Sequence, residues 1–356
     1  YRAGIERLRR YLFSLTSDRT KHLRKLTGTH WGTYEVEASD GRVTALHPFS
    51  EDPDPSPIGQ GIVDVLDGPT RVDAPMVRKG WLENGPGPSD LRGREAFVEV
   101  SWDEAERLVA DELARVKEQH GNKAIYAGSY GWASAGRFHH AQSQIHRFLN
   151  TMGGYTRSVD TYSFAAAQVI LPHVLGAARP VIYPGTAWSS IVENTKTFVA
   201  FGGVPVKNGQ IAQGGLGRYR QTGAIREAAA AGVEFVNISP LRSDMMDEAG
   251  AEWLALRPSS DTAILLGLCH TLLAENLHDR AFLDRYTTGF DRFAAYLDGT
   301  ADGLPKTADW AAEISGLNAD RLRDLARRMA ATRTMISVSW SLTRQDHGEQ
   351  PFWAAI

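Results

Sequence analysis

The fold is decided by residues 197–203, which read TFVAFGG. The four apolar residues in succession after Thr197, without polar alternation, are typical of a strand covered on both faces of a parallel sheet. Two glycines end this run, and a helical pattern at 224–231 leads to the next predicted strand at 233–238. The order strand, glycine loop, helix, strand predicts a doubly wound α/β domain.

The same alternation continues on both sides of this stretch. Helical patterns near 261–275 and 319–331 precede another apolar strand at 335–339. Upstream, a short apolar strand is predicted at 124–127 and a helix at about 137–149. We therefore expect an α/β region that extends well beyond the opening stretch.

The N-terminal part has a different pattern. Residues 33–37 and 42–46 alternate around Asp-Gly at 40–41, which predicts a β-hairpin with a type I′ turn. A helix is expected to begin after Ser101, because Ser101 and Glu104 form a capping box. We expect a small antiparallel β region ahead of the α/β domains.

Composition excludes several classes of protein. The 356 residues carry 39 basic and 42 acidic side chains, for a net charge of −3, so neither nucleic acid nor an anionic membrane is an expected partner. No apolar run reaches the length of about 18 residues that a membrane-spanning helix needs. The single cysteine, Cys269, excludes a cysteine-ligated iron–sulfur cluster within this chain and is predicted to be a core residue.

Polar residues follow the predicted strands, where open α/β sheets bind ligands. They are glycine, serine, asparagine, lysine and arginine, and they lie in residues 129–134, 202–208, 238–243 and 339–344. The glycines at 215–217 do not continue into G-x-G-x-x-G, and no P-loop motif is present. These residues alone predict a pocket for an anionic ligand of unknown identity.

No familiar catalytic motif surrounds the histidines or the isolated Ser163. His173, His270 and His347 lack the spacing of a zinc site, and Ser163 lacks the G-x-S-x-G nucleophile elbow. Composition and spacing therefore give Ser163 no chemical role.

A set of short motifs, in order, resembles one enzyme family. They are residues 29–32 (THWG), 74–80 (APMVRKG), 98–105 (VEVSWDEA), 128–132 (GSYGW), 152–155 (MGGY), 162–163 (YS), 166–176 (AAQVILPHVLG), 306–311 (KTADWA) and 347–350 (HGEQ). This set resembles the dimethyl sulfoxide reductase family of molybdenum enzymes, in the branch of dimethyl sulfoxide, trimethylamine N-oxide and biotin sulfoxide reductases. The resemblance runs from about residue 29 to the end of the chain.

The resemblance implies a metal site and a reaction. It implies one molybdenum held by two molybdopterin guanine dinucleotides, with Ser163 as the protein ligand and without an iron–sulfur cluster. A hard alkoxide oxygen suits a high-valent molybdenum centre. Tyr130 and Trp132 would flank the metal as hydrogen-bond donors and act in catalysis. The implied function is an oxidoreductase that transfers an oxygen atom from an S-oxide or N-oxide, such as dimethyl, biotin or methionine sulfoxide or trimethylamine N-oxide, to water.

The resemblance also assigns cofactor-binding residues. They are Trp132, Ser134, Lys207, Asn208, Ile238, Ser239, Ser259, Ser260, Asp261, Trp340, Ser341 and Arg344. Two positions depart from the family pattern. Ser239-Pro240 stands where relatives commonly have Asp-Pro, which removes a carboxylate that would bind ribose or guanine. Phe164 replaces a small polar residue after the serine and is expected to reshape the substrate funnel.

The expected organisation is that of an incomplete fragment of a larger multidomain molybdoenzyme. The predicted parts are an N-terminal helical extension (1–28), a small antiparallel β domain (29–75), an α/β domain carrying the metal ligand (76–192) and a truncated Rossmann-like dinucleotide-binding domain (193–356). The chain begins with Tyr1 and ends in an apolar segment, which favours a fragment.

Partners and alternatives follow from the same resemblance. The expected partners are a small S-oxide or N-oxide and an electron donor, either a cytochrome, an NAD(P)H-linked carrier or a thioredoxin-like protein. No direct membrane insertion is expected, and the compartment is either cytoplasm or periplasm. One alternative is a non-redox molybdenum or tungsten hydratase or hydroxytransferase of the same superfamily. Another is a degenerate, non-catalytic α/β binding module.

Overall fold

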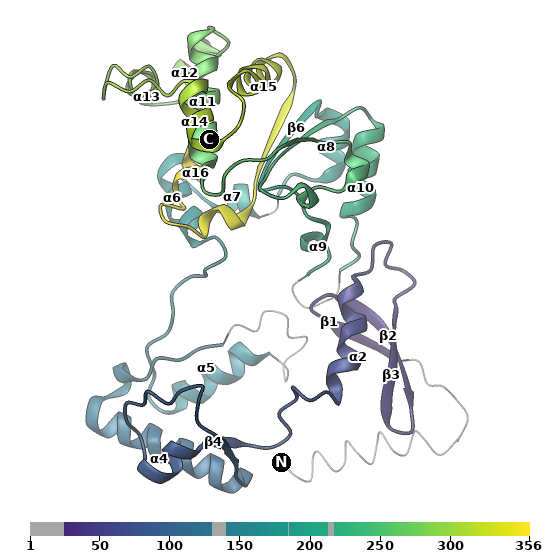
Figure 1. Ribbon diagram of the computed structural model, residues 1–356, viewed down its shortest axis with the longest axis vertical. Helices are drawn as coiled ribbons and strands as arrows, with labels where there is room; N and C mark the ends of the chain where they lie inside the picture. The colour runs from purple at the N-terminus through teal and green to yellow at the C-terminus, as the bar shows by residue number, and fades with distance from the viewer. Residues whose placement is uncertain (1–24, 130–139, 184, 213–216) are drawn as a thin grey trace. The chain divides into compact units, whose positions relative to one another are not determined.

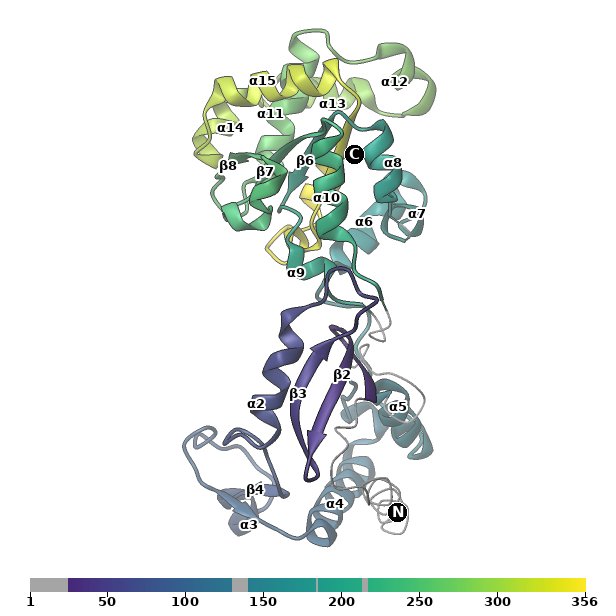
Figure 2. The same cartoon turned by 90° about the vertical axis from the view of Figure 1, so that its right-hand side faces the viewer.

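The computed structural model describes residues 25–129, 140–183, 185–212 and 217–356, which form two compact units. The first unit comprises the described residues of 1–159 and 211–218, and the second those of 160–210 and 219–356. Figures 1 and 2 show the elements of both. The predicted division into four domains stays a prediction.

The first unit contains the expected antiparallel sheet, with strands β1 (Lys25–Thr29), β2 (Gly32–Ser39) and β3 (Arg42–Pro48) in that order. The hairpin between β2 and β3 is confirmed. Its two turn residues, Asp40 and Gly41, have φ angles of 51° and 79°, which a type I′ turn requires.

The rest of the first unit is mainly helical. Ser101 caps the long helix α4 as predicted, because its Oγ accepts a hydrogen bond from the Glu104 N–H at 3.2 Å. The predicted strand at 124–127 is wrong: a 3₁₀ turn occupies 122–124, and only Tyr126 forms a β-bridge, to Thr156. The other elements are η1 (Pro57–Gly59), α2 (Gln60–Leu66), β4 (Met76–Arg78), α3 (Lys79–Asn84), β5 (Phe97–Glu99), α4 (Trp102–His120), η2 (Asn122–Ala124) and α5 (Ala141–Thr151).

The second unit is built on a parallel sheet, which confirms the α/β fold predicted from residues 197–203. Its strand order is β8-β7-β6-β9, from β6 (Thr197–Phe201), β7 (Glu234–Ile238), β8 (Glu252–Leu254) and β9 (Thr334–Val338). All three strand pairs are parallel, and β6 lies in the interior of the sheet. Each crossover between parallel strands must pass over a face of the sheet, so both faces are available for helices.

Alternate side chains of β6 enter two separate hydrophobic clusters. Val199 and Phe201 pack with apolar residues of α6, α11, α14 and α15. Phe198 and Ala200 pack on the other face with residues of α8 and α10. Burial on both faces explains why this strand is apolar throughout, and Figure 1 shows helices on both sides of the sheet.

The helices predicted at 224–231, 261–275 and 319–331 are confirmed, and the second unit also contains helices and turns that were not predicted. The helices and turns are α6 (Ala165–Leu175), α7 (Arg179–Ile182), α8 (Trp188–Asn194), α9 (Val206–Gly209), α10 (Gln221–Ala230), η4 (Arg242–Asp244), η5 (Asp247–Ala249), α11 (Asp261–Ala274), α12 (Arg280–Tyr286), α13 (Phe290–Leu297), α14 (Ala308–Ser315), α15 (Ala319–Ala331), η6 (Trp340–Thr343) and α16 (Gln350–Ala354). None of the helices in the described part of the chain is long and apolar enough to cross a membrane.

Candidate functional site

A pocket with polar and apolar lining residues lies beyond the carboxyl ends of the parallel strands in the second unit. It has a volume of about 200 Å³, and we call it the strand-end pocket. The loops that follow β6, β7, β8 and β9 all contribute to it. Its lining residues are Gly202, Ser239, Pro240, Asp244, Pro258, Ser259, Asp261, Ser341, Leu342, Arg344 and Gln345. This is the edge at which open α/β sheets bind ligands.

Several residues predicted to bind the cofactor meet in this pocket. They are Ser239, Ser259, Asp261, Ser341 and Arg344. Because parallel strands end at the same edge of a sheet, residues more than a hundred positions apart become neighbours. Hydroxyl, carboxylate and guanidinium groups together suit a ligand that carries phosphates, sugar hydroxyls and a polar base.

Other predicted residues lie near the pocket without lining it. The Ser260 hydroxyl donates a hydrogen bond to the Arg257 carbonyl at 2.6 Å, so it closes the turn before α11. The Ile238 side chain is fully buried in the core, and its carbonyl accepts a hydrogen bond from the Gly202 N–H at 2.9 Å. Lys207 and Asn208 are exposed in the short helix α9.

Three predicted residues cannot be placed. Tyr130, Trp132 and Ser134 lie outside the described residues. Their proposed roles therefore stay predictions from the family resemblance.

Gly202 allows a close approach of two segments at the base of the pocket. Its φ angle is 80°, in the region that favours glycine. A Cβ atom here would lie 2.6 Å from the Cβ of Ser339 and 2.8 Å from Cδ1 of Leu342. The loop after β6 can therefore pack against the loop after β9 only because residue 202 has no side chain.

Asp261 is the most deeply buried carboxylate of the pocket. It is the first residue of α11, directly after Ser260, and its side chain is almost inaccessible to solvent. Burial raises the pKa of Asp261 to about 6. The preceding Ser259 has a φ of 68°, which is uncommon for a residue other than glycine. The turn places Asp261 in the lining of the pocket.

Ser163, the predicted metal ligand, is held by the segment that lines the pocket. It immediately precedes Phe164, the N-cap of α6. Its carbonyl accepts hydrogen bonds from Thr343 Oγ1 at 3.1 Å and from Arg344 Nε at 3.4 Å. Residues 180 positions apart thus fix the backbone of Ser163 beside the strand-end pocket.

An aromatic cluster reinforces this contact. The rings of Phe164 and Trp340 are stacked with their centroids 4.1 Å apart. Tyr183 meets both rings edge-on, at 6.2 Å from Phe164 and 6.1 Å from Trp340. Phe164 is buried, whereas Tyr183 and Trp340 remain partly exposed. Phe164, which replaces a small polar residue of the family pattern, therefore packs against Trp340, a predicted cofactor-binding residue.

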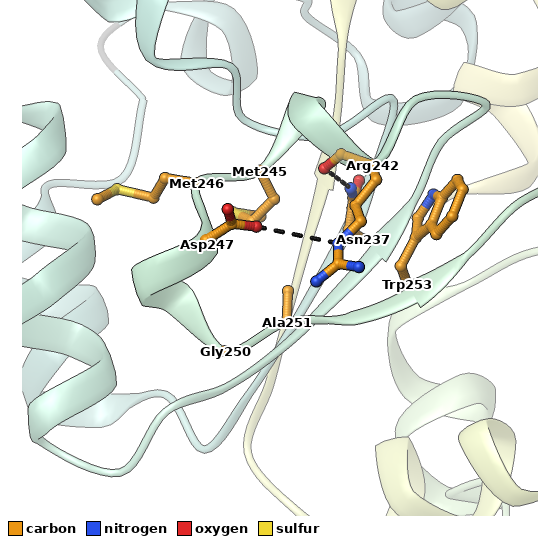
Figure 3. A pocket seen from close by; sticks show the side chains of 8 residues that line it. All are labelled: Asn237, Arg242, Met245, Met246, Asp247, Gly250, Ala251 and Trp253. Carbon is orange, nitrogen blue, oxygen red and sulfur yellow. Dashed lines mark hydrogen bonds and ion pairs between the residues drawn. The ribbon is translucent and has the colours of Figure 1, made fainter.

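A second pocket lies on another side of the turn after β7 (Figure 3). We call it the turn pocket; its volume is about 270 Å³. Its lining residues are Asn237, Arg242, Met245, Met246, Asp247, Gly250, Ala251 and Trp253. Asn237 is buried, and its Nδ2 donates hydrogen bonds to the carbonyls of Leu241 and Arg242 at 3.4 and 3.2 Å. Asn237 thereby braces the turn that separates the two pockets.

Sequence reasoning missed one charged residue of the strand-end pocket, Asp244. It is the last residue of η4, and its Oδ2 accepts a hydrogen bond from Ser239 Oγ at 2.5 Å. The signal that could have identified it is an acidic residue in the turn after the second strand of a strand–helix–strand unit, where dinucleotide-binding folds place a carboxylate.

A parallel sheet with helices on both faces defines an α/β fold, and comparison with known proteins defines the family. The molybdopterin oxidoreductase model matches residues 71–356, and the model of the molybdopterin oxidoreductase N-terminal domain matches residues 27–67. The chain belongs to the molybdopterin oxidoreductase family.

Relatives and a solved structure agree with this family. A dimethyl sulfoxide/trimethylamine N-oxide reductase of Cereibacter sphaeroides is 44% identical over 334 residues, which are 93% of this chain and 40% of the relative. A biotin sulfoxide reductase of the same organism is 46% identical over 313 residues, 87% of this chain and 42% of the relative. The chain thus spans about two fifths of the length of these relatives. The structure of acetylene hydratase from Pelobacter acetylenicus shares the fold, with a TM-score of 0.63, 19% identity, and coverage of 92% of this chain and 42% of that one.

Proposed function

We propose that the protein to which this chain belongs is a molybdenum-dependent reductase. It would remove an oxygen atom from a small S-oxide or N-oxide, and two electrons and two protons would convert that oxygen to water. Family membership and the reductases among the relatives support this proposal. The observation that carries it is the contact between Ser163 and residues 343–344, because it joins the predicted metal ligand to the predicted cofactor pocket.

The residues of the strand-end pocket fit a molybdopterin guanine dinucleotide. Arg344 supplies a guanidinium for phosphate, and Ser259 and Ser341 supply hydroxyls. Asp261 supplies an acceptor for the N–H groups of a base. The close packing at Gly202 brings backbone near the ligand, as dinucleotide-binding loops do. The proposed cofactor is molybdenum with two such dinucleotides.

Ser163 would hold the metal through its side-chain oxygen. When bound, molybdenum would supply the two-electron redox chemistry that amino-acid side chains lack. The hydrogen bonds from Thr343 and Arg344 fix the Ser163 carbonyl and so limit the directions in which the hydroxyl can point. Such positioning is the protein's main contribution in a cofactor enzyme.

Hydrogen-bond donors and aromatic side chains would position the substrate. By the family resemblance, Tyr130 and Trp132 would each donate a hydrogen bond to the oxygen of the substrate. The stacked rings of Phe164, which directly follows Ser163, and Trp340 would offer an apolar surface to the substrate. This surface suits the alkyl groups of an S-oxide or N-oxide.

The electron donor and the compartment belong to the same proposal. We expect a cytochrome, an NAD(P)H-linked carrier or a thioredoxin-like protein to deliver electrons, and the enzyme to act in the cytoplasm or the periplasm. Cell fractionation distinguishes the compartments, and reduction assays with each class of carrier distinguish the donors.

Metal and pterin analysis of the full-length protein tests the proposal, together with turnover of S-oxides and N-oxides by a reduced dye. We expect one molybdenum and two guanine nucleotides per protein, and dye oxidation that depends on substrate. Bound metal without dye-driven turnover would favour a non-redox hydratase or hydroxytransferase. Absence of both molybdenum and guanine would indicate a non-catalytic binding module.

A further inference from the structure

The carboxylate of Asp244 is held by a hydrogen bond from Ser239. The Ser239 hydroxyl accepts a hydrogen bond from the Leu241 N–H at 3.2 Å and donates one to Asp244 Oδ2 at 2.5 Å. A hydroxyl has a single proton, so accepting from the backbone directs that proton at the carboxylate. Both Ser239 and Asp244 line the strand-end pocket.

The backbone of Asp244 is fixed from two sides. Its carbonyl accepts a hydrogen bond from the Val204 N–H at 2.7 Å. A Cβ on Gly203 would lie 2.4 Å from the same carbonyl oxygen, so the approach requires glycine there. On the other side, Asn237 binds the carbonyls of Leu241 and Arg242, as Figure 3 shows in part. Asp244 is therefore positioned before any ligand binds.

The Asp244 carboxylate retains capacity to accept hydrogen bonds. Arg242, in the same turn, pairs with Asp247 at 3.9 Å in the turn pocket. Among the described residues no cation pairs with Asp244, and no group donates a hydrogen bond to its Oδ1. An ionised carboxylate has about four lone-pair sites, of which Ser239 uses one. A ligand with two adjacent hydroxyl donors would complete this arrangement.

We propose that Asp244, oriented by Ser239, binds the ribose hydroxyls of a guanine nucleotide in the strand-end pocket. Asp244 follows β7, the second strand of the unit β6-α10-β7, whose first strand is followed directly by Gly202 and Gly203. An acidic residue at this place binds ribose hydroxyls in dinucleotide-binding folds, which supports the assignment by analogy. A carboxylate repels phosphate, so the sugar is the complementary part of the ligand. The inference rests on the proposed function, because the cofactor supplies the nucleotide.

This assignment explains how the chain tolerates Ser239 at the strand end. Ser239 has no carboxylate of its own, but its hydroxyl places that of Asp244 at the same edge of the pocket. Ser239 and Asp244 together place a carboxylate at the position where relatives commonly have an acidic residue. Asp261 remains available to the base.

Nucleotide binding by the cofactor-free full chain tests the inference without any activity measurement. Calorimetric titration of the wild type should show GDP binding about tenfold more tightly than 2′-deoxy-GDP, since one charge-assisted hydrogen bond is lost. Asp244→Asn should weaken GDP binding about tenfold and remove the preference for ribose. Ser239→Ala should reduce the preference less, because it loosens the carboxylate without removing it.

Asp247→Asn is the matched control. Asp247 is another acidic residue of the same loop, is mostly exposed and lines the turn pocket instead. This variant should bind both nucleotides as the wild type does, and circular dichroism should show both asparagine variants folded.

Two results would overturn the inference. One is an Asp244→Asn variant that still prefers GDP over 2′-deoxy-GDP, and the other is a wild type that binds both nucleotides equally or binds neither. The proposed function is judged separately, from molybdenum content and S-oxide turnover of the wild type. If the wild type reduces S-oxides but Asp244→Asn still prefers GDP over 2′-deoxy-GDP, only the ribose contact is refuted. If GDP binding depends on Asp244 but the wild type contains no molybdenum, only the proposed reductase function is refuted.

Discussion

The interior of the parallel sheet and its carboxyl edge are made by the same strands but from different kinds of residue. Inside, Val199 and Val236 are fully buried among apolar side chains from helices on one face. At the edge, Ser239, Asp244 and Asp261 surround a pocket. Burial of apolar side chains in the interior stabilises the fold, whereas the edge contains strained turns and a buried carboxylate, which destabilise it. This contrast indicates that the edge is shaped for a ligand.

The largest effect is expected at Ser163, the proposed metal ligand. Ser163→Ala in the full-length enzyme should lower reductase turnover on the order of a thousandfold, comparable with loss of a key transition-state contact. The fold should be retained, because the contacts to Thr343 and Arg344 use the Ser163 carbonyl. Dye-linked assays and circular dichroism measure the two effects. Ser189→Ala, on the exposed side of α8, is the control; unchanged turnover in Ser163→Ala would remove this serine from the metal.

The interior can be tested with two isoleucines in helices. Ile264 in α11 is fully buried, and Ile314 in α14 is 41% exposed. Ile264→Ala should lower the free energy of unfolding by about 2–5 kcal/mol through lost burial and a cavity. Ile314→Ala should cost clearly less, because it already contacts water. Urea denaturation of the two variants gives the comparison, and equal losses would contradict the assigned core.

Two glycines separate backbone strain from packing at the edge. Gly202 and Gly232 both have positive φ, at 80° and 86°, but only Gly202 has neighbours where a Cβ would lie. Gly232→Ala should destabilise the protein by roughly 1–2 kcal/mol through backbone strain alone. Gly202→Ala should cost a further 1–3 kcal/mol, approximately, from the clash with Ser339 and Leu342. Thermal unfolding measures both, and a smaller loss at Gly202 would show that the two loops separate readily.

The smallest expected effect concerns the pH dependence of nucleotide binding. Burial raises the pKa of Asp261 to about 6, so the carboxylate that accepts hydrogen bonds is fully present only above that pH. Binding of GDP should therefore strengthen as pH rises from 5 to 7, by up to about tenfold. Asp261→Asn should bind weakly with little change over this range. Calorimetric titration with GDP between pH 5 and pH 7 tests this prediction. Binding by the wild type that does not change with pH would contradict a direct role for ionised Asp261.

The same burial affects stability with the opposite sign. Because the folded-state pKa of Asp261 lies above the usual value of 3.8, the folded protein binds more protons between about pH 4 and pH 6. The contribution of Asp261 to stability therefore falls as pH rises through this window and is constant above it. The pocket thus holds a carboxylate at a cost to folding, which a bound ligand would offset.

Much of the fold could be predicted because its signals are local. The apolar run 197–201, the turn at Asp40 and Gly41 and the cap at Ser101 each depend on neighbouring residues, and the structure confirms all three. The strand predicted at 124–127 failed because a strand needs a partner along its length, and only Thr156 pairs with it. Local pattern cannot supply that partner.

The site was less predictable from local sequence. Strand ends marked the region, and the family resemblance named Ser239, Asp261 and Arg344, which the structure brings together. Asp244 was missed because its position depends on the hydrogen bond from Ser239 and on the contact with Val204. Such contacts arise only when the turn folds back on the sheet.

The sequence by itself determined the doubly wound sheet, because an uninterrupted run of apolar residues predicts a strand that is buried on both faces. Through its motifs it also determined the molybdopterin oxidoreductase family. Only the tertiary structure decided that Phe164 stacks on Trp340, that residues 343–344 hold Ser163, and that Ser239 holds the carboxylate of Asp244. The physical reason is distance along the chain: these contacts join loops that meet only after parallel strands align their carboxyl ends.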